Sequence, residues 1–360
     1  MNRPCCRSIV LLAAVLGGTA DGQRSVAGRA AGPAERAVAC APDPLVPGVE
    51  FTRITVDTGE IVIARVTRAV VAPDDGLWVL DGTGPVIVKL DSAGRLQRAI
   101  TARGEGPGEL SQPEAMAVRP DGALLVADRK PPRVLEFDAA GRFRGSRPIP
   151  AAAVATDLDV GADGRLYIAT AFGTARRLVE RRFFVRVVDS TGREAGLDEV
   201  DDRRLAEDPL RGSMVVAAYV AVSPSGVIVT TYQPAYVLRW FDPRGTLLRE
   251  HAGCQGTIGD SKREVRRGDR VGVHFRPFAY DLAFDRQGVL YHLTPSEDGG
   301  YHLLDRYSPD GERLRPILLP GRGAKGTYLG MVLPTSRPDI FWGYNPITGE
   351  IFRLVIDELR

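Results

Sequence analysis

The chain has 360 residues, of which 44% are hydrophobic and 26% are charged, and these proportions are typical of a globular protein. Its 47 basic and 45 acidic residues leave a formal net charge of +2, which provides no overall field to recruit nucleic acid or an anionic membrane. We therefore expect no nucleic-acid partner. The 40 glycines and 26 prolines indicate many turns.

The N-terminus has the order of a secretory signal peptide. Arg3 and Arg7 precede the apolar stretch Ser8–Leu16, and small residues follow it, so we expect cleavage after Ala20 or Gly22. This apolar stretch is too short to span a bilayer, and no later run reaches the roughly 18 residues that a transmembrane helix needs. We therefore predict an exported protein, periplasmic or extracellular, without a transmembrane segment.

Removal of the signal would leave two cysteines, Cys40 and Cys254, in a compartment that permits disulfides. The sequence does not show whether they approach within bonding distance, so a disulfide and two unpaired thiols both stay open. Residues 23–48 are rich in Ala, Gly, Pro and Arg and show no periodicity. We interpret them as a flexible linker.

Beyond the linker, short apolar runs alternate with turns in units that repeat at intervals of roughly 40 to 60 residues. Each unit has four runs, and a pair ending in glycine stands between the first and second and between the third and fourth. Such pairs supply the positive φ that two-residue hairpin turns need. The pairs are Asp75-Gly76, Ala93-Gly94, Asp121-Gly122, Ala140-Gly141, Asp163-Gly164, Thr191-Gly192, Ser225-Gly226, Arg244-Gly245, Gln287-Gly288 and Asp310-Gly311.

After five complete units, only three apolar runs remain before Arg360. We expect the segment Phe51–Asp57 to supply the missing strand by pairing with the last one. The predicted fold is all-β, a six-bladed β-propeller of four-stranded antiparallel blades, closed by pairing of the N-terminal and C-terminal strands in the last blade. We assign residues 1–22 to the signal peptide, 23–48 to the linker and 49–360 to the propeller.

Strand parity places the glycine turns on one face of the ring and the other connections on the opposite face. The longer segments all belong to the second set. They are residues 103–113, 171–182, 194–214, 251–277 and 295–300. Since binding residues tend to lie in variable loops on a rigid scaffold, we expect the site on this loop-rich face and at the mouth of the central channel.

The segment Gly104–Phe143 resembles an NHL repeat. Its matching residues, in order, are Gly104-Glu105-Gly106-Pro107-Gly108-Glu109, Pro113, Pro120-Asp121-Gly122, Val126-Ala127-Asp128, Arg133 and Phe137-Asp138. From about residue 51 onward the chain is similar to exported bacterial six-bladed propellers that carry one G-x-G-P-G-E segment after the first blade. The resemblance implies the fold and a structural ion pair between Asp128 and Arg133, but it specifies no activity.

Sequence motifs for catalysis are weak. No helix follows Glu109, so we interpret the GEGPGE run as a crossover between blades with Arg103 and Glu105 at the channel mouth, and not as a phosphate loop. Zinc needs three or four converging ligands, whereas all four histidines belong to blade five or the loops leading into it. They are His251, His274, His292 and His302, for which we expect structural or surface roles.

Polar residues are expected at two places on the ring. Asp201, Asp202, Arg266 and Arg267 belong to charged segments of the loop-rich face, where a polar ligand or a protein segment could dock between them. The first strands are expected to bring Asp157, Tyr219, Tyr280 and Asp281 to the axis, where the tyrosines either contact a ligand or fill the channel mouth.

We therefore predict a secreted or periplasmic, non-catalytic binding module for a protein, peptide or glycan. Its ligand-binding candidates are Arg103, Glu105, Asp157, Asp201, Asp202, Tyr219, Arg266, Arg267, Tyr280 and Asp281. The alternative is a channel-centred, metal-assisted hydrolase or lyase. No cofactor is predicted. A divalent metal bound in the channel stays an open alternative.

Overall fold

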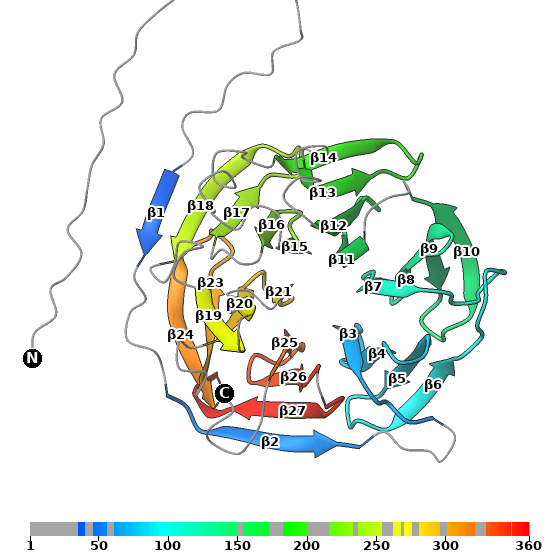
Figure 1. Cartoon of the computed structure of the whole chain (residues 1–360), viewed down its shortest axis with the longest axis horizontal. Helices are drawn as coiled ribbons and strands as arrows, with labels where there is room; N and C mark the ends of the chain where they lie inside the picture. The colour runs from blue at the N-terminus through cyan, green and yellow to red at the C-terminus, as the bar shows by residue number, and fades with distance from the viewer. Residues whose placement is uncertain are drawn as a thin grey trace, which may run out of the picture. The chain divides into compact units, whose positions relative to one another are not determined.

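Six four-stranded antiparallel blades stand around a central axis (Figure 1). The structure is a computed structural model. It describes residues 35–39, 46–55, 61–149, 154–172, 183–199, 216–232, 237–253, 262–267, 270–275, 281–295, 301–320, 329–346 and 348–359. The predicted fold class, an all-β six-bladed propeller, is confirmed by this arrangement.

Blades one to three follow each other along the chain. Blade one consists of β3 (Val66–Val71), β4 (Leu77–Asp81), β5 (Val86–Leu90) and β6 (Leu96–Ile100). Blade two consists of β7 (Pro113–Val118), β8 (Leu124–Arg129), β9 (Pro132–Phe137) and β10 (Phe143–Pro148). Blade three consists of β11 (Val154–Val160), β12 (Leu166–Phe172), β13 (Phe183–Val188) and β14 (Glu194–Glu199). In each blade the first strand lies nearest the axis (Figure 1).

Blades four and five have the same order, and a hairpin stands between them. Blade four consists of β15 (Val216–Val222), β16 (Ile228–Tyr232), β17 (Val237–Phe241) and β18 (Leu247–Gly253). Blade five consists of β21 (Asp281–Phe284), β22 (Leu290–Pro295), β23 (Tyr301–Tyr307) and β24 (Arg313–Pro320). The hairpin consists of β19 (Lys262–Arg267) and β20 (Arg270–Phe275).

Blade six contains strands from both ends of the described chain. Its strands are β25 (Met331–Pro334), β26 (Ile340–Tyr344), β27 (Ile351–Ile356) and β2 (Val49–Ile54), and the short 3-10 helix η1 (Asp357–Leu359) follows β27. The ladder between β2 and β27 is antiparallel and runs from the pair Val49–Ile356 to the pair Ile54–Ile351. The strand expected at Phe51–Asp57 thus begins two residues earlier and ends at Ile54.

Two strand pairings were not expected from the sequence. β1 (Glu35–Ala39) lies within the segment interpreted as a flexible linker and pairs in parallel with β18 at the outer edge of blade four. The end of β12 pairs with the start of β15 through Ala171–Ala217 and Phe172–Val216. Main-chain hydrogen bonds therefore join blades three and four in one sheet.

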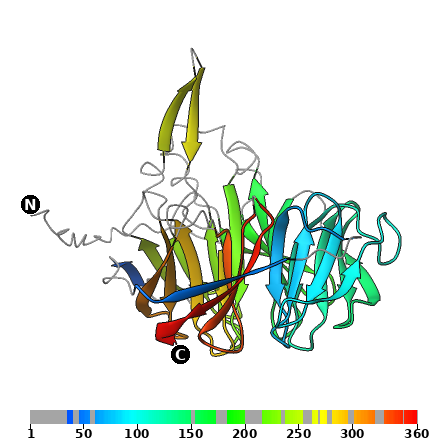
Figure 2. The same ribbon diagram turned by 90° about the horizontal axis from the view of Figure 1, so that it is seen from below.

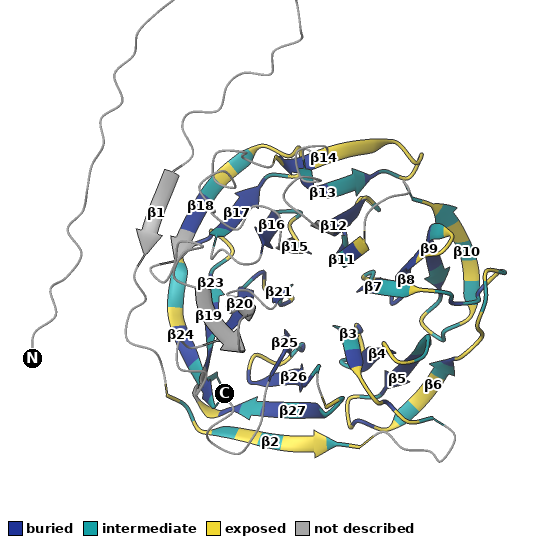
Figure 3. Ribbon diagram, in the orientation of Figure 1, coloured by how far each residue is buried: buried dark blue, intermediate teal, exposed yellow. Residues whose placement is uncertain are grey.

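Apolar clusters fill the interfaces between neighbouring blades. In the described part of the chain there are six such clusters, one for each interface. Trp78 of blade one packs with Phe137 of blade two, and Trp342 of blade six packs in one cluster with Leu77 of blade one. Because each blade is covered on both faces, the second strands are buried along their length, whereas outer strands such as β10 expose alternate residues (Figure 3).

The glycine turns are three-residue loops, so the expected two-residue hairpin turns were wrong. In the turn between β5 and β6, the Gly94 N–H donates to Asp91 O at 2.8 Å and the Asp91 N–H to Arg95 O at 2.9 Å. Only Gly94 has positive φ, at 83°. This is the pattern of a type I turn followed by a left-handed residue, which needs one permissive position instead of two. The Asp91 side chain also accepts the N–H groups of Ala93 and Arg95.

The hairpin of β19 and β20 projects from the side opposite these turns (Figure 2). Figure 2 shows the hairpin of β19 and β20 standing off the ring on one side, while the tight turns lie on the other. Most of the long segments expected on the loop-rich face lie outside the described residues.

Candidate functional site

A central cavity of about 590 Å³ is lined by residues from the first strand of every blade. Its lining continues into the turns that follow those strands, so the cavity reaches the tight-turn side of the ring. Turn residues in the lining are Pro73, Asp75, Pro120, Ala162, Pro224 and Arg286. This is the channel mouth opposite the loop-rich face on which the sequence placed the site.

Carboxylates on the inner strands bind the main chain of the next blade. The first strand of a blade has no partner on its channel side, so its N–H groups need other acceptors. Asp157 Oδ2 accepts the Val220 N–H at 3.1 Å, and Asp159 Oδ2 accepts the Val222 N–H at 2.6 Å. These two bonds connect blade three to blade four across the channel edge.

Blade two is connected to blade three in the same way. Glu114 Oε2 of β7 accepts the Ala155 N–H of β11 at 2.8 Å, and its other oxygen pairs with Arg129 at 3.1 Å. Burial raises the pKa of Glu114, although these partners partly oppose that rise. The carboxylates of the channel thus accept main-chain N–H groups on the inner strand of the next blade.

Arg68 of β3 reaches across the cavity to blade three. Its guanidinium donates to the main-chain carbonyls of Thr67, at 2.9 Å, and Thr156, and lies 5.9 Å from the centre of the Tyr219 ring. Burial disfavours its charge, but the nearby tyrosines and carboxylates raise the pKa of Arg68 overall. A permanent cation therefore faces the acidic residues of the channel.

Asp281 of β21 differs from the other channel acids. It is 5% exposed and lines the cavity, and its Oδ1 accepts the N–H of the next residue, Leu282, at 2.6 Å. Among the described residues, its Oδ2 has no hydrogen-bond donor, whereas Asp157 uses one oxygen on Leu158 and the other on Val220. Asp281 therefore lines the cavity with one oxygen to which the described residues donate no hydrogen bond.

Burial raises the pKa values of all three aspartates of the channel. Burial raises the pKa of Asp157 to about 6, against the opposing effects of Arg68 and two N–H donors. It raises the pKa of Asp159 to about 7, and the charge of Asp157 contributes to that rise. Burial and then the charge of Asp157 raise the pKa of Asp281 well above its usual range.

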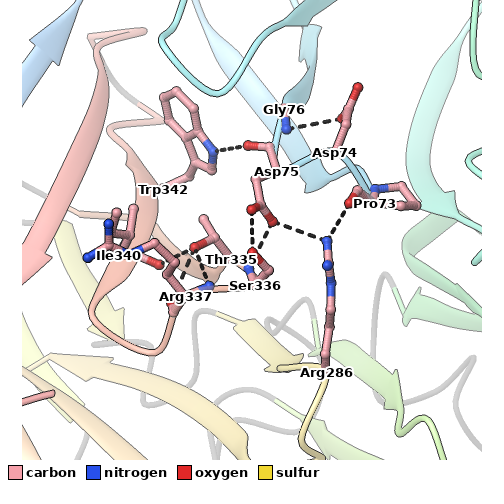
Figure 4. A network of polar contacts seen from close by, with 10 residues as sticks. All are labelled: Pro73, Asp74, Asp75, Gly76, Arg286, Thr335, Ser336, Arg337, Ile340 and Trp342. Carbon is pink, nitrogen blue, oxygen red and sulfur yellow. Dashed lines mark hydrogen bonds and ion pairs between the residues drawn. The ribbon is translucent and has the colours of Figure 1, made fainter. Parts of the chain in front are cut away.

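A second polar network joins three blades at the rim of the cavity (Figure 4). Asp75, in the first turn of blade one, has a positive φ of 61°. Its carboxylate accepts the Ser336 N–H at 2.8 Å and pairs with Arg286 of blade five at 3.1 Å, while its carbonyl accepts Trp342 Nε1–H at 2.9 Å. The turn of blade one is thus tied to blades five and six.

Arg103 and Glu105 lie away from this cavity, in the loop between blades one and two. Both are exposed, and neither lines the cavity. The loop is held by Arg133, which donates to the carbonyls of Glu105 and Glu109 at 2.7 and 2.8 Å and pairs with Asp128 at 3.3 Å. The structural ion pair implied by the NHL resemblance is therefore present. The carbonyls of the GEGPGE run face a cation, which fits a crossover and not an anion cradle.

The remaining sequence candidates divide into two groups. Asp157, Tyr219 and Asp281 come together around the channel, although Tyr219 contacts Arg68 and does not line the cavity. Several candidates lie outside the described residues or have no described side chain. They are Asp201, Asp202, Tyr280, Arg266 and Arg267, and the cysteines Cys40 and Cys254.

The described histidines are buried within blades four and five. His251 Nε2 lies 3.1 Å from Gly311 O and packs on Trp240, and His302 Nε2 accepts the Leu329 N–H at 3.3 Å. His292 is fully buried in β22, and burial lowers its pKa to about 3. None of the three lines the cavity. Within the described ranges, no group of three or more His, Cys, Asp or Glu side chains is arranged to hold a metal ion.

Sequence reasoning did not identify Arg68, Asp159 and Glu114. A usable signal was present, because each is a charged residue inside an apolar run that parity places next to the axis. Inner strands are covered on both faces, so a charge there is informative. The hydrogen bonds of these residues to other blades could not be seen, because their partners are distant in the sequence.

Comparison with known proteins shows the fold alone. No family model matches the chain, and no curated protein sequence matches it. A protein of Bacteroides fragilis described as exported has a TM-score of 0.57 at 11% identity, covering 89% of this chain and 99% of that one. A streptogramin B lyase has a TM-score of 0.52 at 12% identity, covering 86% and 98%. The WD40 repeats of RRP9 have a TM-score of 0.52 at 13% identity, covering 87% and 100%. The described part of the chain contains no helix of the length and hydropathy that a membrane crossing requires.

Proposed function

We propose that this protein is an exported, non-catalytic binding module that holds a protein segment, a peptide or a glycan at its central channel. The observation that carries the proposal is the cavity of about 590 Å³ lined by Asp281, to whose carboxylate the described residues supply one N–H donor. This volume is within the range of ordinary ligand pockets. The other channel acids are engaged with main-chain N–H groups, which favours a scaffold over a catalytic set.

Export to the periplasm or the extracellular space is supported by the charge and apolar order of the first 22 residues. The fold shared with an exported Bacteroides protein agrees with it. The Gly104–Glu109 segment and the pair Asp128–Arg133 support an NHL-like repeat. WD40 repeats, with the same general architecture, support a role in holding a partner.

A second candidate is a channel-centred hydrolase or lyase. It is favoured by one observation, the neighbouring carboxyls of Asp157 and Asp281 with raised pKa values, because a carboxyl that titrates near neutral pH can transfer protons as a general acid or base. A lyase among the proteins of similar fold agrees with this candidate.

Binding to peptide and oligosaccharide arrays tests the proposal. Val222 is a partly exposed residue of the cavity lining, so Val222→Trp should obstruct the cavity. Val62, 63% exposed and outside the lining, provides the matched control Val62→Trp. We expect discrete array signals from the native protein and the control, and at least tenfold weaker signals from Val222→Trp.

Two other results would decide against a channel site. Equal binding by all three proteins would contradict it. Loss of binding in a variant that replaces Arg266, Arg267, Asp201 and Asp202, with retention in Val222→Trp, would move the site to the loop-rich face. Turnover of an array compound that Asp157→Asn abolishes would support the enzyme instead.

A further inference from the structure

We propose that the group held in the cavity is a primary ammonium on an apolar stem, bound at the carboxylate of Asp281 beside that of Asp157. This inference rests on the proposed function and names the ligand chemistry of the same cavity. Both a lysine side chain and a free alkylamine contain an ammonium on such a stem.

The first argument is the unused acceptor of Asp281. A carboxylate that is nine-tenths buried loses most of its hydration, and this loss is costly unless hydrogen bonds or an opposite charge replace it. In the described part of the chain, Asp281 has one N–H donor, from Leu282, although its two oxygens can accept several. A donor supplied by a ligand would complete its hydrogen bonding.

The second argument is the charge of the channel. The charged residues of the lining are five aspartates and three arginines, so the lining is negative overall when the acids are ionised: Asp75, Asp157, Asp159, Asp281, Asp285, Arg68, Arg119 and Arg286. Arg68 donates to main-chain carbonyls, and within the described residues it forms no ion pair with these carboxylates. A cation entering the cavity therefore meets an excess of negative charge, in surroundings where electrostatic attraction is less screened than in water.

The third argument separates an ammonium from other cations. A guanidinium fork matches the two coplanar oxygens of one carboxylate, whereas one oxygen of Asp281 and both oxygens of Asp157 already accept N–H groups. An ammonium is a compact charge with three rotatable donors and can use single acceptors from two carboxylates. Within the described residues no set of three acidic or histidine ligands is arranged for a metal ion.

The apolar lining accounts for the stem. Between the acids, the lining consists mainly of aliphatic side chains from several blades. They include Met116, Leu158, Val220, Leu282, Met331 and Leu333. A chain of a few methylene groups can contact this surface while its ammonium reaches the carboxylates. Burial raises the pKa values of Asp157 and Asp281 although the charge of Arg68 opposes the rise, so a further cation would stabilise their ionised forms.

Four-carbon probes of different charge test the inference by NMR titration of the purified protein. Butylamine should bind at least tenfold more tightly than butanol or butyrate at pH 8, because only it can donate a charge-assisted hydrogen bond to Asp281. Nα-acetyl-lysinamide is a separate arm. Tighter binding of this compound than of butylamine points to a lysine side chain as the natural group, and the reverse to a free amine.

Two variants link the binding to Asp281. Asp281→Asn should weaken butylamine at least tenfold, while Asp281→Glu, which keeps the charge, should restore part of the affinity. Glu194→Gln, on the outer strand β14, is the control and should change nothing. The thermal melting of each variant is measured in parallel to identify unfolding.

The native protein supplies a test that needs no variant. Butylamine remains charged between pH 8 and pH 5, while Asp157 and Asp159, with pKa values of about 6 and about 7, become protonated. The pKa of Asp281 is raised by burial and by the charge of Asp157, against the opposing charge of Arg68, so Asp281 also gains protons as the pH falls. Its affinity should therefore fall as the pH falls. A pH-independent affinity, or absence of butylamine binding, overturns the inference. If butanol or butyrate binds instead of butylamine, and Val222→Trp abolishes that binding, the assignment of an ammonium ligand is wrong. The proposed function, binding at the central cavity, would still hold.

Discussion

Asp157 has two opposing effects on the ring. Its oxygens accept N–H groups from Leu158 and Val220, which connects two blades. Its burial next to Asp281 also makes its ionised form unfavourable, so that its pKa rises to about 6. A neutral carboxyl keeps acceptor capacity without the full cost of a buried charge. The folded ring therefore binds protons at this residue more tightly than the unfolded chain does.

This difference predicts how stability changes with pH. Because the folded pKa of Asp157 lies above its ordinary value of 3.8, the contribution of this residue to stability is fully present below about pH 4 and is lost as the pH rises through 6. In the native protein, this loss should lower the free energy of unfolding by up to about 3 kcal/mol between about pH 4 and pH 6. Asp157→Asn should abolish this part of the pH dependence. Urea unfolding at pH 4.5, 6 and 7.5 measures it.

The charged groups that interact with Asp157 are Arg68, Asp159 and Asp281. Asp189, whose pKa is lowered by hydrogen bonds from Thr191 and Arg193, is the control. It titrates below this interval, so Asp189→Asn should leave the slope between pH 4.5 and 7.5 unchanged. Identical slopes in the native protein and Asp157→Asn would contradict the assigned cost of burial.

At the scale of the element, the turns combine two local requirements. An acid or serine at the first position accepts N–H groups from the loop, as Asp138 does from Ala140 and Arg142. Three positions later, a glycine adopts positive φ, as Gly141 does at 74°. The two features together define the hairpin better than the glycine pair alone.

Two glycines in one hairpin of blade two provide a matched test. An alanine at Gly141 would adopt positive φ and place its Cβ 3.0 Å from Arg98, whereas Gly145 has ordinary φ and nothing within 4 Å. Gly141→Ala should lower the free energy of unfolding by about 1–2 kcal/mol. Gly145→Ala should be neutral or raise it by up to about 1 kcal/mol. Thermal or urea unfolding measures both, and equal effects would contradict the role given to the turn.

The sequence predicted elements better than the contacts between them. The period of the apolar runs located the six blades, because each strand needs apolar residues on both covered faces, and parity located Asp157 and Asp281 near the axis. The turn type was missed because a glycine pair fits more than one hairpin. The joining of β12 to β15 could not be predicted, since the geometry of two separate blades sets it. That the described residues supply Asp281 with a single N–H donor could not be predicted for the same reason.

At the scale of the whole molecule, Asp75 stabilises the contact between the first and last blades. The carboxylate of Asp75 contacts Ser336 and Arg286 from a turn position with positive φ. Aspartate tolerates this conformation better than most residues. Trp342 donates to the carbonyl of the same residue. One turn therefore fixes the relative position of three blades.

A double-mutant cycle measures this contact. Asp75→Asn should lower the free energy of unfolding by about 1–3 kcal/mol, because it removes a charge from hydrogen bonds while tolerating the same φ. Ser336→Ala should cost less, and the coupling between the two changes should be about 1 kcal/mol. Asp310→Asn, in an exposed turn of blade five, should have no measurable effect. Additive effects at Asp75 and Ser336 would show that the contact contributes nothing.

The pairing of β2 with β27 sets an order of events during synthesis. A ribosome makes β2 before any blade and β27 after all the others, so β2 has no partner until Ile351–Ile356 has emerged. Until then, the apolar faces that blade six covers on blades five and one stay in contact with water. The five-bladed intermediate is therefore the species most exposed to aggregation, and its lifetime, more than the stability of the finished ring, should limit the yield of folded protein.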